Sequence, residues 1–178
     1  MRQDGPVTEP APPHPLVAEA SRRAALVWVA AAGRPAAALW CLPLADGLYV
    51  VTGPGEQDAP GLAGAATAEV TARGDHGGRI ATWTAAVDRI APDGPRWAEA
   101  AAALAAKRLN GGGPAADLVA RWAADGVAVL CLAPTPAPPA GGADLPAGAQ
   151  AAPPRDTPAT RPARRPFRLH RVRRPPRG

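Results

Sequence analysis

The chain has 178 residues, the size of one ordinary domain, and a net charge of +5. It contains 24 prolines and 19 glycines but one phenylalanine and one tyrosine, so a core has to use Leu, Val, Ile and five tryptophans. Residues 155–178 hold nine arginines and one acid, and the other eleven basic and fourteen acidic residues make the remainder mildly acidic. This distribution excludes a folded domain with a uniformly basic surface.

Two features of the sequence indicate the compartment. The longest uncharged apolar run, "AALVWVAAA", is about half as long as a membrane span, and residues 1–15 have no apolar stretch typical of a signal peptide. Cys41 and Cys131 each lie in an apolar run, which favours two buried thiols in a reducing compartment over a disulfide. We therefore expect a cytoplasmic protein without a membrane span.

The composition divides the chain into three parts. Residues 1–15 are rich in proline and lack periodicity, which predicts a disordered leader. Residues 134–178 are rich in Pro, Ala and Arg and cannot bury enough apolar surface to offset the entropy of ordering, so we expect a disordered tail. The structured domain is predicted at residues 16–133.

The first half of this domain is predicted to form three strands. Residues 25–31 end at a Gly-Arg-Pro turn, and residues 35–44 lead to Asp46-Gly47, a dipeptide typical of two-residue hairpin loops with positive φ. Residues 48–52 form the returning strand and stop at the Gly-Pro-Gly turn. A short helical segment follows at residues 58–65, with its first residue, an aspartate, as the expected N-cap.

The second half of the domain is predicted to form two strands, two helices and a last strand. The alternation in "ATAEVTAR" predicts a half-buried strand at 66–73, and a long strand follows at 79–91. Helices are predicted at 93–110, capped by its first aspartate, and at 114–126, which ends at a glycine. The continuous apolar run at 127–134 is typical of a strand buried on both faces. Short antiparallel strands in series favour a mainly β, closed or half-closed barrel with flanking helices.

Four segments carry a resemblance to a known family. They are "LYVVT" with the glycine turn and short helix after it, "ATAEVTARGDHGGRIATWTAAVDRIAP", a helix that begins at Trp97, and the terminal "VLCLAP". In this order they resemble the pyridoxamine 5′-phosphate oxidase-like, FMN-binding split-barrel family, in an actinobacterial-type branch with "GPGEQ" and "KRLN" signatures. The resemblance covers about residues 20–134 and implies a six-stranded antiparallel split barrel. It also implies a homodimer that holds FMN, or a deazaflavin, between its subunits.

The resemblance implies a set of cofactor-binding residues. Thr52 matches a strand-end threonine near the flavin phosphate, and the phosphate loop corresponds to residues 53–57. Arg73 and Arg79, on either side of "GDHGG", match basic groups that reach the phosphate. Glu56 and Gln57 suit the edge of the site, and Trp83 suits a ring face. Because a bound flavin carries the reaction, the resemblance implies an oxidoreductase with no catalytic side chain of its own.

The sequence departs from the family at three places. The loop reads Gly55-Glu56-Gln57-Asp58, which has anions where the family has cations. The strand after the turn reads Arg79-Ile80-Ala81-Thr82 and lacks the glutamine and second arginine of the oxidase, and Cys131 replaces an arginine before Leu-Ala-Pro. These differences argue against turnover of pyridoxamine phosphate itself.

Each candidate also has a structural interpretation. The Gly53–Gln57 loop needs no ligand as a strand-to-helix turn, and Arg73 and Arg79 are equally consistent with two solvated strand-end charges. Trp83, like Trp28 and Trp40, is also suited to filling a core that is poor in phenylalanine. His76 is expected in a turn rather than as a base.

The C-terminal tail offers an alternative function. Its arginines alternate with Phe167, Leu169 and His170, a pattern compatible with a nucleic-acid backbone or an acidic membrane surface. An extension without function, produced by a GC-rich genome, has the same composition. The competing hypothesis to a flavoprotein is therefore a cofactor-free dimeric scaffold in which the tail binds nucleic acid or another polyanion.

Overall fold

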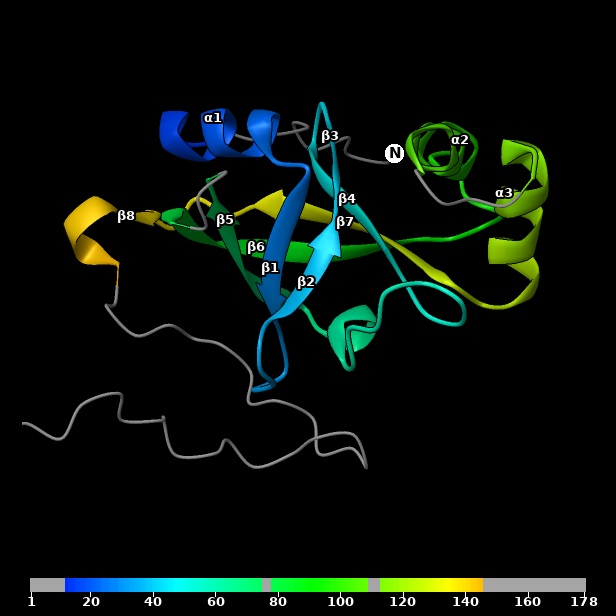
Figure 1. The fold of residues 1–178 in the computed structure, drawn as a ribbon, viewed down its shortest axis with the longest axis horizontal. Helices are drawn as coiled ribbons and strands as arrows, with labels where there is room; N and C mark the ends of the chain where they lie inside the picture. Colours follow the sequence, from blue (N-terminus) through cyan, green and yellow to red (C-terminus); the bar gives the residue numbers. More distant parts are fainter. Residues whose placement is uncertain (1–11, 75–77, 109–112, 146–178) are drawn as a thin grey trace, which may run out of the picture.

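The protein is described by a computed structural model that covers residues 12–74, 78–108 and 113–145. In these ranges an antiparallel sheet runs in the order β2-β1-β5-β6-β7-β4-β3, with β8 paired to β6. Helices lie at the periphery of the sheet (Figure 1). The prediction of a mainly β antiparallel barrel with flanking helices is confirmed. The elements are α1 (Pro15–Arg23), β1 (Leu26–Ala30), β2 (Ala37–Trp40), β3 (Leu42–Leu44), β4 (Gly47–Thr52), η1 (Leu62–Gly64), β5 (Thr67–Arg73), β6 (Arg79–Ile90), α2 (Trp97–Lys107), α3 (Ala115–Ala124), β7 (Ala128–Pro134), β8 (Ala140–Gly141) and η2 (Gly142–Asp144).

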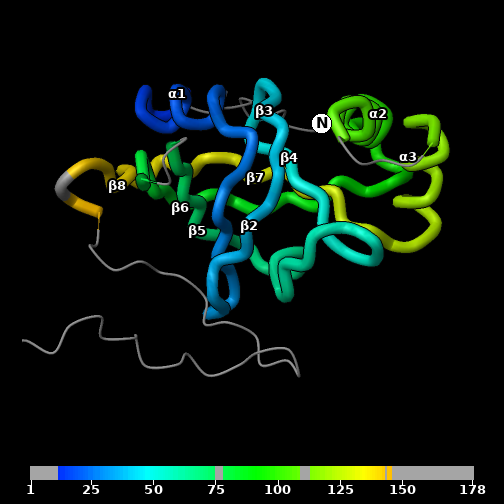
Figure 2. The backbone as a smooth tube through the Cα atoms, viewed as in Figure 1, coloured from blue at the N-terminus to red at the C-terminus, as the bar shows by residue number. Residues whose placement is uncertain are grey.

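The two edge strands of the sheet, β2 and β3, are consecutive in the chain, and this nearly closes the barrel. The chain runs from β2 directly into β3 (Figure 2), so the segment predicted as one strand at 35–44 is two strands. Cys41 separates them, and its backbone N–H donates to the carbonyl of Ala25 at 3.1 Å. β2 pairs with β1 and β3 pairs with β4, because this bend transfers the chain from one side of the barrel to the other.

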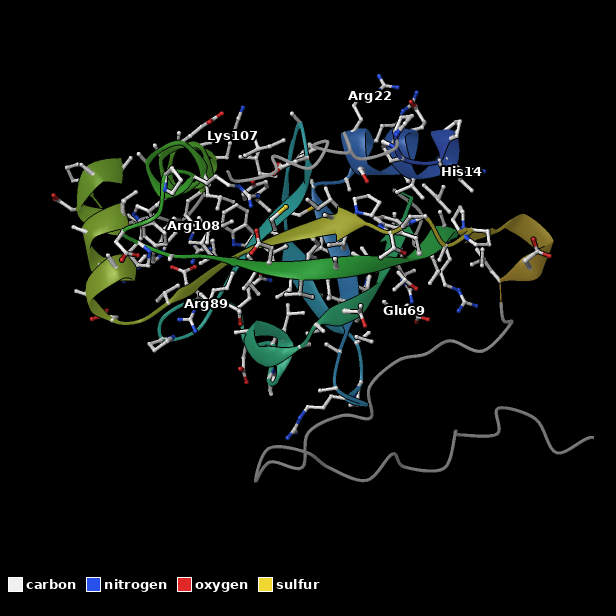
Figure 3. All side chains as sticks on the ribbon, turned by 180° about the vertical axis from the view of Figure 1, so that it is seen from behind. His14, Arg22, Glu69, Arg89, Lys107 and Arg108 are labelled. Carbon is white, nitrogen blue, oxygen red and sulfur yellow. The ribbon has the colours of Figure 1, made fainter. Side chains whose placement is uncertain are left out.

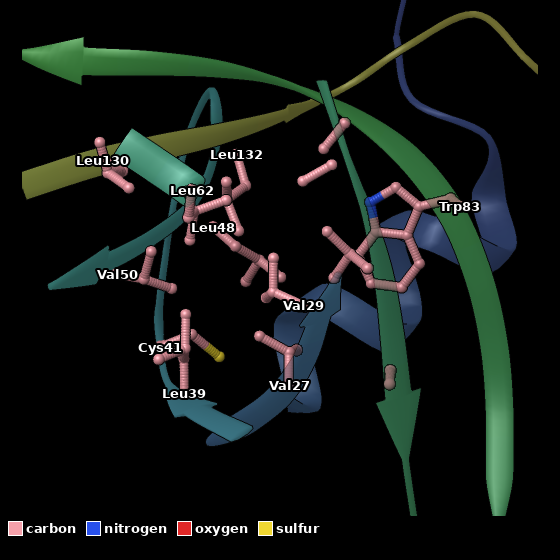
Figure 4. Close-up of a cluster of buried hydrophobic side chains, with 14 of the residues drawn as sticks. Val27, Val29, Leu39, Cys41, Leu48, Val50, Leu62, Trp83, Leu130 and Leu132 are labelled. Carbon is pink, nitrogen blue, oxygen red and sulfur yellow. The ribbon is translucent and has the colours of Figure 1, made fainter. Parts of the chain in front are cut away.

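Side chains alternate between two hydrophobic cores. On β4, Leu48 and Val50 point into the barrel, where they join Trp83 and the valines of β1 (Figure 4), while Tyr49 and Val51 point outward. The outward set packs against α2 and α3. β7 alternates in the same way, so the prediction of a strand buried on both faces is confirmed.

Two of the helix starts differ from those predicted. α2 begins at Trp97 with Arg96 as its N-cap, so the prediction that Asp93 caps this helix is wrong. α3 ends near Gly126, whose φ of +68° favours glycine, as predicted. The short helical segment predicted at 58–65 is the 3-10 turn η1, and its N-cap is Gly61 rather than Asp58.

Two features of the fold were not assigned from the sequence. α1 begins at Pro15, and its Val17 and Ala20 are buried in the barrel core. After residue 133, β8 pairs with β6, and a Cβ placed on Gly141 lies 2.7 Å from a methyl carbon of Leu16 on α1. This close approach brings β8 against both α1 and the barrel.

The β3–β4 hairpin forms as predicted, but its turn residues differ. The pairing of Leu44 with Gly47 leaves Ala45 and Asp46 as the loop, and neither Asp46 nor Gly47 has a positive φ. Gly47 is needed for a different reason: a Cβ there lies 2.7 Å from the carbonyl oxygen of Leu132 on β7. The glycine therefore allows β4 and β7 to approach each other.

We predict that Gly47→Ala lowers the free energy of unfolding by about 1–3 kcal/mol, because backbone has to move to accommodate the methyl group. Urea denaturation checks this. Gly64→Ala is the matched control, since a Cβ at Gly64 has no atom within 4 Å and its φ is not positive. Equal stability of the two variants would contradict the role assigned to Gly47.

Candidate functional site

The Gly53–Gln57 loop begins with a tight turn. The N–H of Glu56 donates to the carbonyl of Gly53 at 3.0 Å, and Gly55 has a φ of +74°. Proline at the second position and glycine with positive φ at the third are the features of a type II turn. The "GPGE" sequence is thus explained by backbone geometry, and the turn directs Glu56 toward the helices.

The buried carboxylate of Glu56 is the centre of a polar group that we call the Glu56 cluster: Glu56, Arg108, Arg121 and Trp122. The Glu56 side chain is 0% exposed. Its Oε2 lies 2.8 Å from Nη2 of Arg108, and its Oε1 lies 3.2 Å from Nη2 of Arg121. Trp122 Nε1 donates to the same Oε1 at 2.9 Å. Figure 3 shows Arg108 between α2 and the barrel. Two cations thus balance the charge of one buried carboxylate.

Gln57 connects the same loop to strand β2. Its Oε1 accepts from the N–H of Trp40 at 2.7 Å, and its Nε2 donates to the carbonyl of Ala38 at 3.0 Å. These backbone groups of β2 point away from β1, into the gap that the sheet leaves between β2 and β4. The amide of Gln57 therefore takes the place of a neighbouring strand there.

Thr52, the last residue of β4, bonds to Ala59 beyond the other end of the loop. It is 5% exposed, and its hydroxyl accepts from the N–H of Ala59 at 3.0 Å. Together, Thr52, Glu56 and Gln57 have their polar groups engaged with the chain itself. Two of the three bond backbone groups and the third pairs with arginines, which is the arrangement of a structural loop.

The second candidate feature is the arginine pair, Arg73 and Arg79. They are cross-strand partners beside the turn of the β5–β6 hairpin, next to a register shift at Ala72. The Arg73 guanidinium lies 5.0 Å from the centroid of the Trp28 ring, and Nη1 of Arg79 is buried without a hydrogen-bond partner in the described chain. The expectation that both guanidiniums leave the sheet at the same end agrees with this register.

Trp83 lies on the other face of β6 from the outward-facing Thr82 and Thr84. It is 3% exposed and belongs to the barrel core, where Figure 4 shows it beside Val29. Trp28, in contrast, is half-buried on the outside of β1 and contacts Arg73. Of the tryptophans considered from the sequence, Trp28 is the one placed beside the arginine pair.

The structure thus divides the predicted site residues into two groups. Thr52, Glu56 and Gln57 join β4 to α2, α3 and β2, whereas the arginine pair lies at the hairpin end of β5 and β6. His76, predicted to be a turn residue, and the arginine-rich tail lie outside the described residues.

A further polar cluster surrounds Arg96, which sequence reasoning missed. Arg96 Nη2 donates to Asp46 Oδ2 and to the hydroxyl of Tyr49, each at 2.6 Å, and the guanidinium also pairs with Asp88. Burial raises the pKa of Tyr49 to about 12. These contacts attach the start of α2 to the β3–β4 hairpin, and they engage every member of the cluster.

The described residues offer little redox or metal chemistry of their own. Cys41 and Cys131 are buried and free, as predicted, and burial raises the pKa of the Cys41 thiol to about 12. A search of the described chain finds no group of three His, Cys, Asp or Glu side chains able to hold a metal ion. Within the same ranges no helix is long and apolar enough to cross a membrane.

Comparison with solved structures identifies the architecture. The chain is similar to HutZ, the heme storage protein from Vibrio cholerae, with a TM-score of 0.52 and 14% sequence identity over 71% of this chain and 92% of that one. The fold is a split barrel. At this identity the likeness concerns the fold alone. No family model and no curated protein sequence matches the chain.

We predict that Glu56→Gln lowers the free energy of unfolding by about 2 kcal/mol, because both arginines lose the charge that balances them. The expected loss of free energy is smaller than for a fully buried ion pair, since the Arg121 side chain is 49% exposed. Chemical denaturation checks this against Glu99→Gln, an exposed glutamate of α2. Equal stability of the two variants would show that the charge of Glu56 contributes nothing to the free energy of unfolding.

Proposed function

We propose that this split-barrel protein binds FMN, or a deazaflavin in its place, with the cofactor phosphate held by Arg73 and Arg79. The observation that carries the proposal is the cross-strand pairing of these two arginines. Two guanidiniums on neighbouring strands can both donate hydrogen bonds to one phosphate. Guanidinium groups also match phosphate oxygens in geometry.

The fit of the individual residues refines the proposal. Nη1 of Arg79 is buried without a partner in the described chain, so it supplies a donor for a phosphate oxygen. The Glu56 cluster does not fit an anion because the buried Glu56 is itself negative and forms ion pairs with both arginines, and the Thr52 hydroxyl already bonds the N–H of Ala59. We therefore assign the phosphate to the arginine pair alone, and we place Trp28 rather than the buried Trp83 beside the ligand.

FMN, when bound, supplies hydride transfer, and the protein acts as an oxidoreductase by positioning it. The role of the described residues is to bind the phosphate, orient the ligand and limit its contact with water. The outer face of β1, β5 and β6 includes exposed Leu26 and Ile80, which are 42% and 41% exposed. A second copy of the chain packed on this face covers these side chains and encloses the ligand, as a homodimer.

The test is a titration of the purified protein with FMN, followed by flavin fluorescence and visible absorbance. We expect saturable binding, and we expect Arg79→Ala to weaken it by about tenfold, the loss of one charge-assisted contact. Arg89→Ala is the matched control, because Arg89 is an exposed arginine at the other end of the same strand.

Parallel titrations with a deazaflavin and with heme separate the related ligands, since HutZ is described as a heme storage protein. Saturable binding of heme with none of FMN overturns the flavin assignment. Protein that ignores all three ligands overturns the whole proposal and favours the cofactor-free scaffold, whose arginine-rich tail then predicts salt-dependent binding of a polyanion.

A further inference from the structure

The strand pair that carries the two arginines contains a β-bulge. Up to Ala72, β5 and β6 follow one register, and Ala72 lies opposite Ala81. The next residue of β5, Arg73, lies opposite Arg79, so Ile80 is the extra residue on β6. Without the bulge the same register would continue and would place Ile80 opposite Arg73. The bulge therefore determines that the two arginines are cross-strand partners.

The shifted register continues as far as the turn. The N–H of Gly74 donates to the carbonyl of Gly78 at 2.8 Å, and these residues are the pair expected after Arg73 and Arg79. A bulge bends its strand and changes the direction of the side chains beside it. The position of Arg79 relative to Arg73 thus depends on how the bulge is held.

The other edge of β6 is held next to the bulge by β8. Gly141 lies opposite Ala81 and Ala140 lies opposite Thr82, which are the two residues that follow the bulge. The carbonyl oxygen of Ile80 is 3.6 Å from a Cβ placed on Gly141, so β8 ends against the bulge itself. Figure 1 shows β8 at the end of the barrel away from α2 and α3. We call Ala140 and Gly141 the β8 clasp.

The β8 clasp is itself supported by its neighbours. Between β7 and β8, the N–H and the hydroxyl of Thr135 both donate to the carbonyl of Thr84 at 3.0 Å, so the chain follows the edge of β6. On α1, a methyl carbon of Leu16 lies 2.7 Å from a Cβ placed on Gly141, and Val17 anchors the helix in the barrel core. The helix therefore keeps β8 against β6.

We infer that the β8 clasp positions the arginine pair: it holds the bulge at Ile80 and thereby the place of Arg79 opposite Arg73. This inference rests on the proposed function and concerns the regulation of that same site. When the β8 clasp is paired, both guanidiniums are held where they reach one phosphate. When it is released, one edge of β6 beside the bulge is unpaired, the local register is less tightly specified, and the arginine pair loses its geometry.

The coupling acts in both directions. If the pairing of β8 raises the affinity for phosphate, the binding of phosphate stabilises the pairing of β8 by the same factor. The arginine-rich sequence of residues 155–178 follows β8 and η2 in the chain. A partner that draws this part of the chain away from β6 therefore lowers the affinity of the arginine pair for its ligand.

Gly141→Pro tests the inference, because proline cannot adopt the φ of −153° at this position and releases β8. Neither hydrophobic core of the described chain includes a residue of β8, so we expect the barrel to stay folded. In a fluorescence titration with FMN we expect the substitution to weaken binding about tenfold, as much as Arg79→Ala. Ala137→Pro is the matched control, since it places a proline at an exposed position of the same segment outside β8.

Two further comparisons separate positioning from a general loss of stability. Gly141→Ala keeps the N–H and the extended backbone, and the end of the Leu16 side chain can move away from one methyl group, so we expect wild-type affinity. In the Arg79→Ala background, Gly141→Pro is expected to cause no further loss, because it acts through Arg79. A loss by the same factor in both backgrounds overturns the inference. If circular dichroism shows that Gly141→Pro is unfolded, Gly141→Val replaces it, since its branched side chain meets Leu16 and the carbonyl of Ile80.

The outcomes also separate the inference from the proposed function. If wild type binds FMN and Gly141→Pro binds it equally well, the β8 clasp does not position the arginine pair, and the inference is overturned while the phosphate site stands. If wild type binds no FMN, the proposed function fails and the inference with it. Amide hydrogen exchange without ligand gives an independent readout: we expect Gly141→Pro to speed exchange in residues 79–82, and unchanged exchange there overturns the inference.

Discussion

The rest of the structure depends on the pairing of one buried carboxylate. The side chain of Glu56 has no exposed surface, so its charge has to be balanced inside the protein, and Arg108 and Arg121 supply that balance from the end of α2 and from α3. The next residue, Gln57, bonds to the backbone of β2 on the other side. One short loop thereby holds the helices on the outside of β4 and fills the gap between β2 and β4.

This constraint determines where a ligand can bind. A glycine-rich loop after a strand suggests a phosphate cradle, but here the cations near the loop are already paired with Glu56. The arginine pair, to which we assign the phosphate, lies instead beside the turn of the β5–β6 hairpin, on the face that the helices α2 and α3 do not cover. The loop maintains the barrel, and the proposed phosphate site lies outside it.

Local patterns predicted most of the fold, because alternation and helical period report on burial directly. They did not reveal the bend at Cys41, since "AALWCLPL" is apolar on both sides of it. They assigned Gly47 to a turn, although its close approach to Leu132 involves a strand 85 residues away in the chain. The same limit applies to the site: the register of Arg73 with Arg79 followed from the hairpin, whereas the partners of Glu56 lie 52 and 65 residues along the chain. No spacing rule connects residues so distant.

Amide hydrogen exchange with and without FMN tests the central claim most directly, because it locates the ligand without any substitution. The account predicts slower exchange at the end of β5 and the start of β6, with no change in residues 53–58. Slower exchange in residues 53–58 together with unchanged exchange at the end of β5 and the start of β6 would contradict it, and would return the ligand to the glycine-rich loop.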